Sequence, residues 1–196
     1  MKIAIDVDGV LIDMGNYQLE KGSKFFMEKY NIGISDPKGY EISDAFLVDQ
    51  AKDHDFWINH IFDYGVDYPA RFGAKEVISK LKADGNEIII MTARGGTEEN
   101  TLPKEEMQEL VKSWLEKNGI YYDEIMFTEE DKLSYCISNN IDLVIEDKPR
   151  NIQMISTAIP VVCFNALYNQ HLEGRNIYRA YSWHDIYSKI KNINNG

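Results

Sequence analysis

Apolar positions along the chain fall into two patterns, short continuous runs and longer stretches with helical spacing. The run at 2–7 is rich in β-branched residues, and four later runs resemble it. Short continuous runs are typical of strands buried in a parallel sheet. Apolar residues three or four positions apart are typical of amphipathic helices. The predicted strands are 2–7, 87–92, 125–127, 141–145 and 160–164; the predicted helices are 14–31, 41–63, 73–83, 103–118, 131–139, 149–157 and 183–193.

The order of these elements predicts an α/β fold with a three-layer α/β/α core of Rossmann-like type. Strands alternate with helices over most of the chain, which favours a mostly parallel five-stranded sheet with right-handed crossovers. Local signals agree at three helix ends. Gly85 suits a left-handed C-cap, Pro103 suits a first turn, and Ser182 suits an N-cap.

The stretch 14–68 does not fit this alternation. It carries helical spacing over a length that exceeds a connecting loop but falls short of a full domain. We therefore expect a small helical cap at 14–68, inserted after the first strand, and a core made of 1–13 and 69–196. A plain pair of surface helices remains the alternative.

Composition narrows the class of protein. The chain has 196 residues, of which 44% are hydrophobic and 12% aromatic, which favours one folded domain over disorder. The net charge of −11 argues against a nucleic-acid polymer as a partner, because phosphate backbones need a basic surface. No apolar run approaches the roughly 18 residues of a membrane span. The first residues lack a signal-peptide pattern, and Cys136 and Cys163 suit buried thiols, so we expect a reducing cytoplasm.

Polar residues gather where four predicted strands end. Because the carboxyl ends of parallel strands meet at one edge of a sheet, these residues should surround a small volume. Two acids separated by one residue repel each other, and a divalent cation such as Mg²⁺ offsets that repulsion. A set of acids, one hydroxyl and cations suits phosphoryl transfer. The residues are Asp6 and Asp8, then Thr92, Ala93 and Arg94, then Lys132, then Glu146 and Asp147.

The series D-V-D-G-V, T-A-R, Lys132 and E-D resembles the four-motif pattern of the haloacid dehalogenase-like phosphatases. The resemblance extends from residue 2 to about 165. It implies that Asp6 is the nucleophile that forms an aspartyl-phosphate. Asp8 would protonate the leaving oxygen and then activate water. An Asp at this second position implies phosphate ester hydrolysis rather than cleavage of a carbon–halogen bond.

The same resemblance implies how phosphate and metal are bound. Thr92 would bind the phosphoryl group through its hydroxyl, with Ala93 and Arg94 in the same motif, and Lys132 would neutralise nucleophile and phosphate. Mg²⁺ would be held by the carboxylates of Asp6 and Asp147 and by the backbone carbonyl of Asp8. Glu146 stands where the family often has a second Asp, so we expect it to support the site.

The substrate is less closely defined. The layout is similar to that of the cytosolic 5′(3′)-deoxyribonucleotidases, which implies a nucleoside monophosphate; a sugar phosphate is the alternative. Aromatic residues of the expected cap suit either base stacking or, as the favoured interpretation, the interior of the cap itself. They are Phe46, Phe56, Trp57, Phe62, Tyr64 and Tyr68. The polar segment 92–101 suits an anion-binding turn before a helix, with Gly95–Gly96 giving close backbone approach or a flexible turn.

Two further classes stay open. A phospho-accepting receiver domain has a similar set of residues, but it carries its acceptor Asp on the third strand and has no large insertion. A chain that binds a ligand without turnover is the other. Arg94 alternatively pairs with Glu98 or Glu99, and the sequence gives no indication of an oligomeric state.

Overall fold

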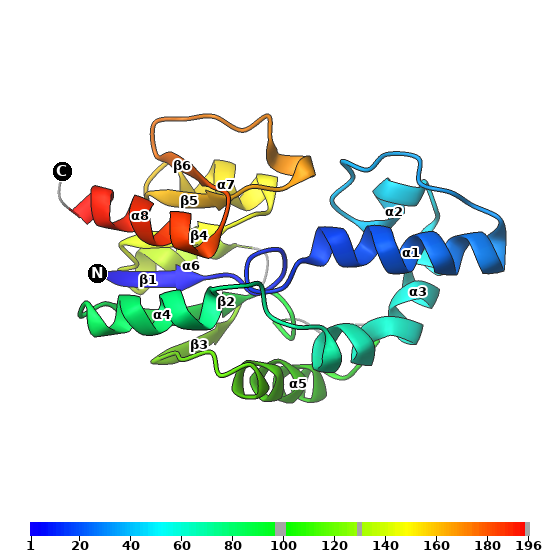
Figure 1. The fold of residues 1–196 in the computed structure, drawn as a ribbon, viewed down its shortest axis with the longest axis horizontal. Helices are drawn as coiled ribbons and strands as arrows, with labels where there is room; N and C mark the ends of the chain where they lie inside the picture. Colours follow the sequence, from blue (N-terminus) through cyan, green and yellow to red (C-terminus); the bar gives the residue numbers. More distant parts are fainter. Residues whose placement is uncertain (97–100, 129–130, 195–196) are drawn as a thin grey trace.

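The computed structural model describes residues 1–96, 101–128 and 131–194. Its centre is a parallel sheet with strand order β3-β2-β1-β4-β5-β6 (Figure 1). The strands are β1 (Lys2–Ile5), β2 (Glu87–Thr92), β3 (Glu124–Phe127), β4 (Leu143–Glu146), β5 (Val161–Phe164) and β6 (Ile177–Ala180).

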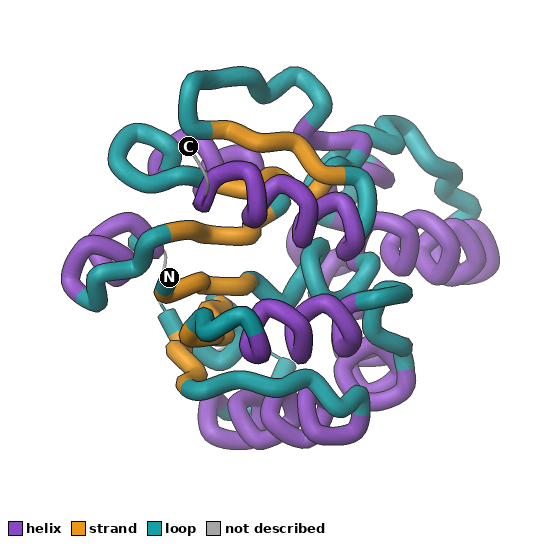
Figure 2. The backbone as a smooth tube through the Cα atoms, turned by 60° about the vertical axis from the view of Figure 1, so that its left-hand side comes forward, coloured by secondary structure: helices purple, strands orange, loops and turns teal. Residues whose placement is uncertain are grey.

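Helices cover both faces of this sheet. Successive side chains of β1 point to opposite sides, so Ile3 and Ile5 join one apolar cluster and Ala4 joins another. The first cluster includes residues of α4 (Ala74–Ala83), α5 (Lys104–Lys117) and α8 (Trp183–Asn194). The second includes residues of α6 (Lys132–Ser138) and α7 (Pro149–Ile155). The predicted α/β/α architecture is confirmed, and Figure 2 shows the strands between the two layers.

The predicted number of strands is wrong by one. The sheet has a sixth strand, β6, which pairs only with β5 at the edge of the sheet. Its residues Ile177, Tyr178 and Arg179 are only partly buried. Because an edge strand with an arginine in its middle lacks a continuous apolar run, the apolar pattern did not indicate it.

The predicted helix 41–63 is also corrected. It divides into α2 (Ile42–Phe46), α3 (Gln50–Phe62) and a π-helical turn, η1 (Asp63–Asp67). Leu47 adopts a left-handed conformation, φ 51°, that ends α2. Asp49 then begins α3 by accepting a hydrogen bond from the Lys52 amide at 3.0 Å.

The three helix-end signals are confirmed. Gly85 has φ 85°, as a left-handed position after α4 requires. Ser182 Oγ accepts from the Asp185 amide at 3.2 Å at the start of α8. Pro103 occupies the N-cap of α5, directly before its first turn.

Residues 14–68, called here the helical insertion, lie beyond the carboxyl end of β1. The insertion comprises α1 (Met14–Tyr30), α2, α3 and η1, and its helices stand to one side of the sheet in both views (Figures 1 and 2). Its aromatic side chains pack mainly on one another; the ring centroids of Phe26 and Phe46 are 4.7 Å apart. Among the described residues, no helix has the length and apolar character needed to cross a bilayer.

Arg71 ties together the two segments that join the insertion to the sheet. Its amide donates to the Leu11 carbonyl at 2.8 Å. Its guanidinium donates to both carboxylate oxygens of Asp13, at 2.9 and 3.0 Å, and to the Gly9 carbonyl at 3.1 Å. A charge-assisted bidentate pair fixes direction as well as distance. The insertion is therefore anchored beside the turn that follows β1.

Candidate active site

A buried lysine links the ends of two neighbouring strands. Asp6 follows β1, Glu146 ends β4, and Lys132 is the first residue of α6. Lys132 Nζ donates to Asp6 Oδ1 at 2.7 Å and to Glu146 Oε2 at 2.8 Å. All three side chains are at least nine-tenths buried. A lysine in such a place needs its anionic partners, since an unpaired buried charge is strongly unfavourable.

Both oxygens of Glu146 are occupied by donors. Oε1 accepts from the amides of Asp147 and Lys148, each at 3.0 Å. Oε2 accepts from Lys132 and from Asn151 Nδ2 at 3.0 Å. Burial alone would raise the pKa of Glu146, but the Lys132 charge and these hydrogen bonds hold it below its usual value. Glu146 is thus an ionised anchor that orients its neighbours.

Asp147 is held on one side and open on the other. Its Oδ2 accepts a hydrogen bond from the Tyr168 hydroxyl, and Asn169 Nδ2 donates to its backbone carbonyl at 2.8 Å. Its Oδ1 is buried and has no hydrogen-bond partner in the described part of the chain. Burial, and then the charges of Glu146 and Asp6, raise the pKa of Asp147 well above its ordinary value. An ionised Asp147 therefore needs a further positive partner.

The turn after β1 presses against this carboxylate. Gly9 has φ 81°, and a Cβ at this position would lie 1.9 Å from Asp147 Oδ2. No other residue type fits, because both the left-handed conformation and the close approach require a missing side chain.

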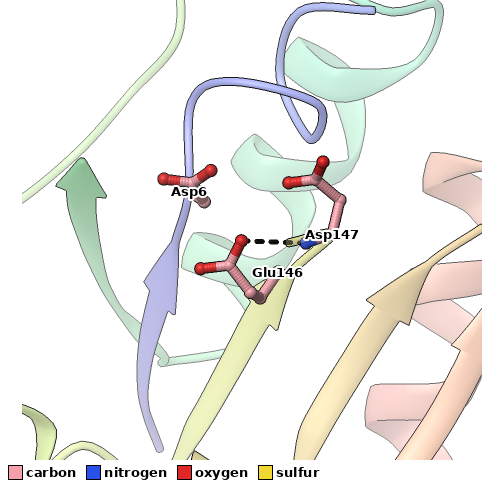
Figure 3. A group of neighbouring side chains, drawn as sticks. All are labelled: Asp6, Glu146 and Asp147. Atoms are coloured by element: carbon pink, nitrogen blue, oxygen red, sulfur yellow. Dashed lines mark hydrogen bonds between the residues drawn. The ribbon is translucent and has the colours of Figure 1, made fainter. Parts of the chain in front are cut away.

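Asp6, Glu146 and Asp147 form a cluster that suits a cation. One ligand oxygen from each lies within 4.8 Å of the others, and all three side chains face one small volume (Figure 3). Burial, against the opposing charge of Lys132, raises the pKa of Asp6 to about 7. Three carboxylates and one ammonium leave two uncompensated negative charges when all are ionised. A divalent cation would neutralise that excess, and hard carboxylate oxygens are the ligands Mg²⁺ prefers.

Asp8 faces a different set of partners. Arg94 Nε donates to Asp8 Oδ2 at 3.1 Å, and Arg94 Nη2 contacts Oδ1. The Tyr64 hydroxyl donates to Asp8 Oδ1 at 2.5 Å. Burial opposes ionisation of Asp8, but the Arg94 charge and the hydrogen bonds lower its pKa below the usual range. In this arrangement Asp8 is an ionised carboxylate paired with Arg94.

Of the T-A-R motif, Thr92, Ala93 and Arg94, only Ala93 lines the cavity beside Asp6. A cavity of about 110 Å³ is lined by Asp6, Asp8, Ala93 and Lys132 together with four other residues. Thr92 ends β2, is fully buried, and accepts the Arg94 amide through Oγ1 at 3.1 Å. Of the described residues, neither Thr92 nor Arg94 lines this cavity. The structure therefore brings the predicted residues together while turning Thr92 and Arg94 toward protein partners.

Sequence reasoning missed residues that complete the site. Lys148, Arg150 and Asn151 line the cavity and follow directly after the E-D motif, a signal that was available in the sequence. Tyr40, which also lines it, comes from the helical insertion, where no spacing rule links it to the strand ends. Tyr64 and Tyr168 are likewise linked to the site only by the folded chain.

The structure bears on the expected roles of Arg94 and of Gly96 in the segment 92–101. Arg94 pairs with Asp8, whereas Glu98 and Glu99 lie outside the described residues. A Cβ on Gly96 would lie 1.8 Å from the Thr128 carbonyl oxygen. Gly96 is therefore required by the loop after β3.

Solved structures with a similar fold include phosphatases and β-phosphoglucomutases. A "predicted phosphatase" from Clostridium acetobutylicum matches with a TM-score of 0.61, 18% identity, and coverage of 97% of this chain and 98% of that one. A D,D-heptose 1.7-bisphosphate phosphatase from B. bronchiseptica, complexed with magnesium and phosphate, matches with a TM-score of 0.54, 13% identity, and coverage of 98% and 99%. At these identities the likeness shows the fold, which a Had-superfamily hydrolase from Ehrlichia chaffeensis and one from Geobacter sulfurreducens PCA also share.

The family can be stated more closely. The family model of the "5' nucleotidase, deoxy (Pyrimidine), cytosolic type C protein" matches residues 1–194, and the chain belongs to this family. A relative from Bacillus subtilis (strain 168), "Putative nucleotidase YqfW", is 25% identical over 93% of this chain and 90% of its own length. The protein is thus a phosphoric monoester hydrolase.

Proposed function

We propose that this protein is a Mg²⁺-dependent phosphatase that hydrolyses nucleoside monophosphates through an aspartyl-phosphate on Asp6. The observation that carries the proposal is the buried Asp6–Lys132–Glu146 chain at the wall of a cavity shared with Asp8. The Lys132 ammonium favours the anionic form of Asp6 and holds it beside the cavity, as a nucleophile that meets a phosphate dianion requires.

The proposed reaction consists of two displacements at phosphorus. The Asp6 carboxylate attacks phosphorus, and the bond between phosphorus and the leaving oxygen breaks with its electron pair on that oxygen. Asp8 donates the proton that neutralises the leaving oxygen. Asp8 then takes a proton from water, whose oxygen attacks phosphorus and releases Asp6 and inorganic phosphate.

Arg94 has to move for Asp8 to act as an acid. The guanidinium keeps Asp8 ionised in the arrangement observed here. We infer that Arg94 turns from Asp8 to the phosphoryl oxygens when substrate enters, so that Asp8 becomes able to carry a proton. Thr92 would support this turn through its hydrogen bond to the Arg94 amide.

The donor set fits Mg²⁺. Asp147 Oδ1, without a hydrogen-bond partner in the described ranges, is an oxygen that a cation would satisfy. The carboxylates of Asp6 and Asp147 and the backbone carbonyl of Asp8 would hold the ion, while Glu146 supports them. Bound there, Mg²⁺ would neutralise charge on the phosphoryl oxygens.

The helical insertion would act as a cap that contacts the leaving group. Tyr40 of the insertion lines the cavity, beside Lys148 and Arg150 of the core. The cap aromatics named from the sequence pack largely on one another, in line with the favoured interpretation, and Tyr40 is the aromatic residue among the described residues that line the cavity. A nucleoside suits an aromatic surface, and the nucleotidase family favours this substrate class. A sugar phosphate is the second candidate, favoured by the small size of the cavity.

Phosphate release measured with Mg²⁺ over nucleoside monophosphates and sugar phosphates tests this proposal. We expect turnover of several nucleotides and little turnover of sugar phosphates, with Asp6→Asn inactive on both. Turnover that prefers sugar phosphates would replace the substrate class. If no compound gives release that depends on Asp6, the receiver-like and binding-only alternatives gain support.

A further inference from the structure

We propose that Tyr64 of the helical insertion is a positioning residue that orients the Asp8 carboxyl toward the leaving oxygen. Through it, protonation of the leaving group depends on a residue that the insertion supplies. This inference rests on the proposed function, in which Asp8 is the proton donor.

The hydroxyl of Tyr64 links the insertion to Asp8, in the turn after β1. Tyr64 is 2% exposed, and its hydroxyl lies 2.5 Å from Asp8 Oδ1 although the two residues are 56 positions apart. Arg94, which belongs to the core, also donates to this carboxylate. If Arg94 turns to the phosphoryl group, Tyr64 is the contact that keeps Asp8 in place.

The ring of Tyr64 is fixed from several directions. Its centroid lies 4.8 Å from that of Tyr17 and 5.4 Å from that of Trp57. The Arg94 guanidinium lies 4.8 Å from the same ring. A buried aromatic ring packed in this way cannot change rotamer without displacing its neighbours. The hydroxyl therefore has one defined position.

The π-helical turn that carries Tyr64 is clamped to the core. The Tyr68 amide donates to the Asp63 carbonyl at 2.8 Å, which closes the π turn. Trp114 Nε1 of α5 donates to the Tyr68 carbonyl at 2.8 Å. A Cβ on Gly65 would lie 2.2 Å from Leu110 Cδ2, so the turn packs directly on α5. Single π turns of this kind are frequent at functional sites.

The chemical consequence is confined to substrates whose leaving oxygen needs a proton. In the first displacement an alkoxide leaves a nucleoside monophosphate, and the Asp8 proton must reach it as the bond breaks. A para-nitrophenolate anion leaves without a proton, because it is stable near neutral pH. Loss of the Tyr64 hydroxyl should therefore slow the first displacement with the first kind of substrate and spare it with the second. The second displacement, in which Asp8 activates water, is common to both substrates.

The test compares Tyr64→Phe with wild type on deoxyuridine monophosphate and on para-nitrophenyl phosphate, both with Mg²⁺. We expect the single-turnover rate of the first displacement, followed as release of the leaving group, to fall by about tenfold to a hundredfold on the nucleotide. We expect the same rate on the aryl phosphate to stay within about twofold. The matched control is Tyr30→Phe, which removes a hydroxyl bonded to Asp55 at the same 2.5 Å within the insertion. This control should leave both activities unchanged.

Equal losses on the two substrates would assign Tyr64 a structural role and overturn the inference. Unchanged activity on both would overturn it as well. Retained aryl phosphate turnover shows that the variant is folded and that Asp6 still reacts. A failure of the proposed function is distinct, since the wild-type protein would then hydrolyse neither substrate.

Discussion

Replacing Asp147 with asparagine should stabilise the metal-free protein while removing its response to Mg²⁺. Burial and two neighbouring carboxylates raise the pKa of Asp147 well above the unfolded value. A carboxyl whose folded pKa is raised weakens the fold as the pH climbs past its unfolded pKa. The asparagine side chain removes that penalty at neutral pH and still offers an oxygen to the Tyr168 hydroxyl.

The expected changes in the free energy of unfolding follow from removal of the Asp147 charge and from Mg²⁺ binding to the folded state. Neutralising one uncompensated buried carboxylate should raise the free energy of unfolding by about 1–2 kcal/mol. For a chain of this size each kcal/mol shifts Tm by about 2–4 °C, so the metal-free variant should melt about 2–8 °C higher. In the wild-type protein, Mg²⁺ at about 100 times its Kd should add about 2.7 kcal/mol, or about 5–11 °C. The variant should show less than about a third of that shift, because Asp147 supplies a proposed ligand oxygen.

Differential scanning calorimetry in chelator and across a Mg²⁺ titration measures both effects near neutral pH. Asp49→Asn is the matched control: it removes one exposed negative charge and leaves an equally good N-cap on α3. The control should respond to Mg²⁺ like wild type. A metal-free Asp147→Asn protein that melts below wild type, or that keeps the full Mg²⁺ shift, would refute the reasoning.

Other predictions concern the turn after β1 and the first residues of β2. Gly9→Ala should destabilise the protein by more than about 1 kcal/mol and should weaken Mg²⁺ binding, because the Cβ of the alanine would meet Asp147. Denaturant unfolding measures the first effect, and metal titration measures the second. The Ile88 amide, with Lys82, lowers the pKa of Asp123 to about 2. The ionised Asp123 carboxylate should stabilise the fold fully above its unfolded pKa of 3.8, and this stabilisation should be lost as the pH falls toward about 2. Urea midpoints of wild type and Asp123→Asn should therefore converge in acid; a constant difference would contradict the assignment.

The parts of the site that lie at strand ends could be predicted from sequence. Parallel strands bring their carboxyl ends together whatever lies between them, so Asp6, Lys132 and Glu146 meet as expected. The sequence did not indicate how Glu146 would be used. Its extra methylene allows it to reach Lys132 and Asn151, and this depends on where α6 and α7 begin.

The parts that depend on packing between distant segments could not be predicted. Tyr64 and Tyr168 reach Asp8 and Asp147 from the insertion and from the segment after β5, and no periodicity links these positions. The division of the predicted helix 41–63 arises from a left-handed Leu47, a residue type that rarely adopts this conformation. The edge strand β6 was missed because a half-exposed strand carries only a weak apolar pattern.

The most direct test of the central claim is to detect phosphate on Asp6. Mixing Asp8→Asn protein with Mg²⁺ and para-nitrophenyl phosphate, followed by rapid acid quench and mass spectrometry, should show one added phosphoryl group on the peptide that contains Asp6. The intermediate should accumulate because the amide introduced in place of the Asp8 carboxylate cannot activate water for the second displacement. The same experiment with Asp6→Asn should show no added group and no phosphate release. Wild-type turnover by Asp6→Asn, or phosphate release by Asp8→Asn with Asp6 never modified, would contradict the account.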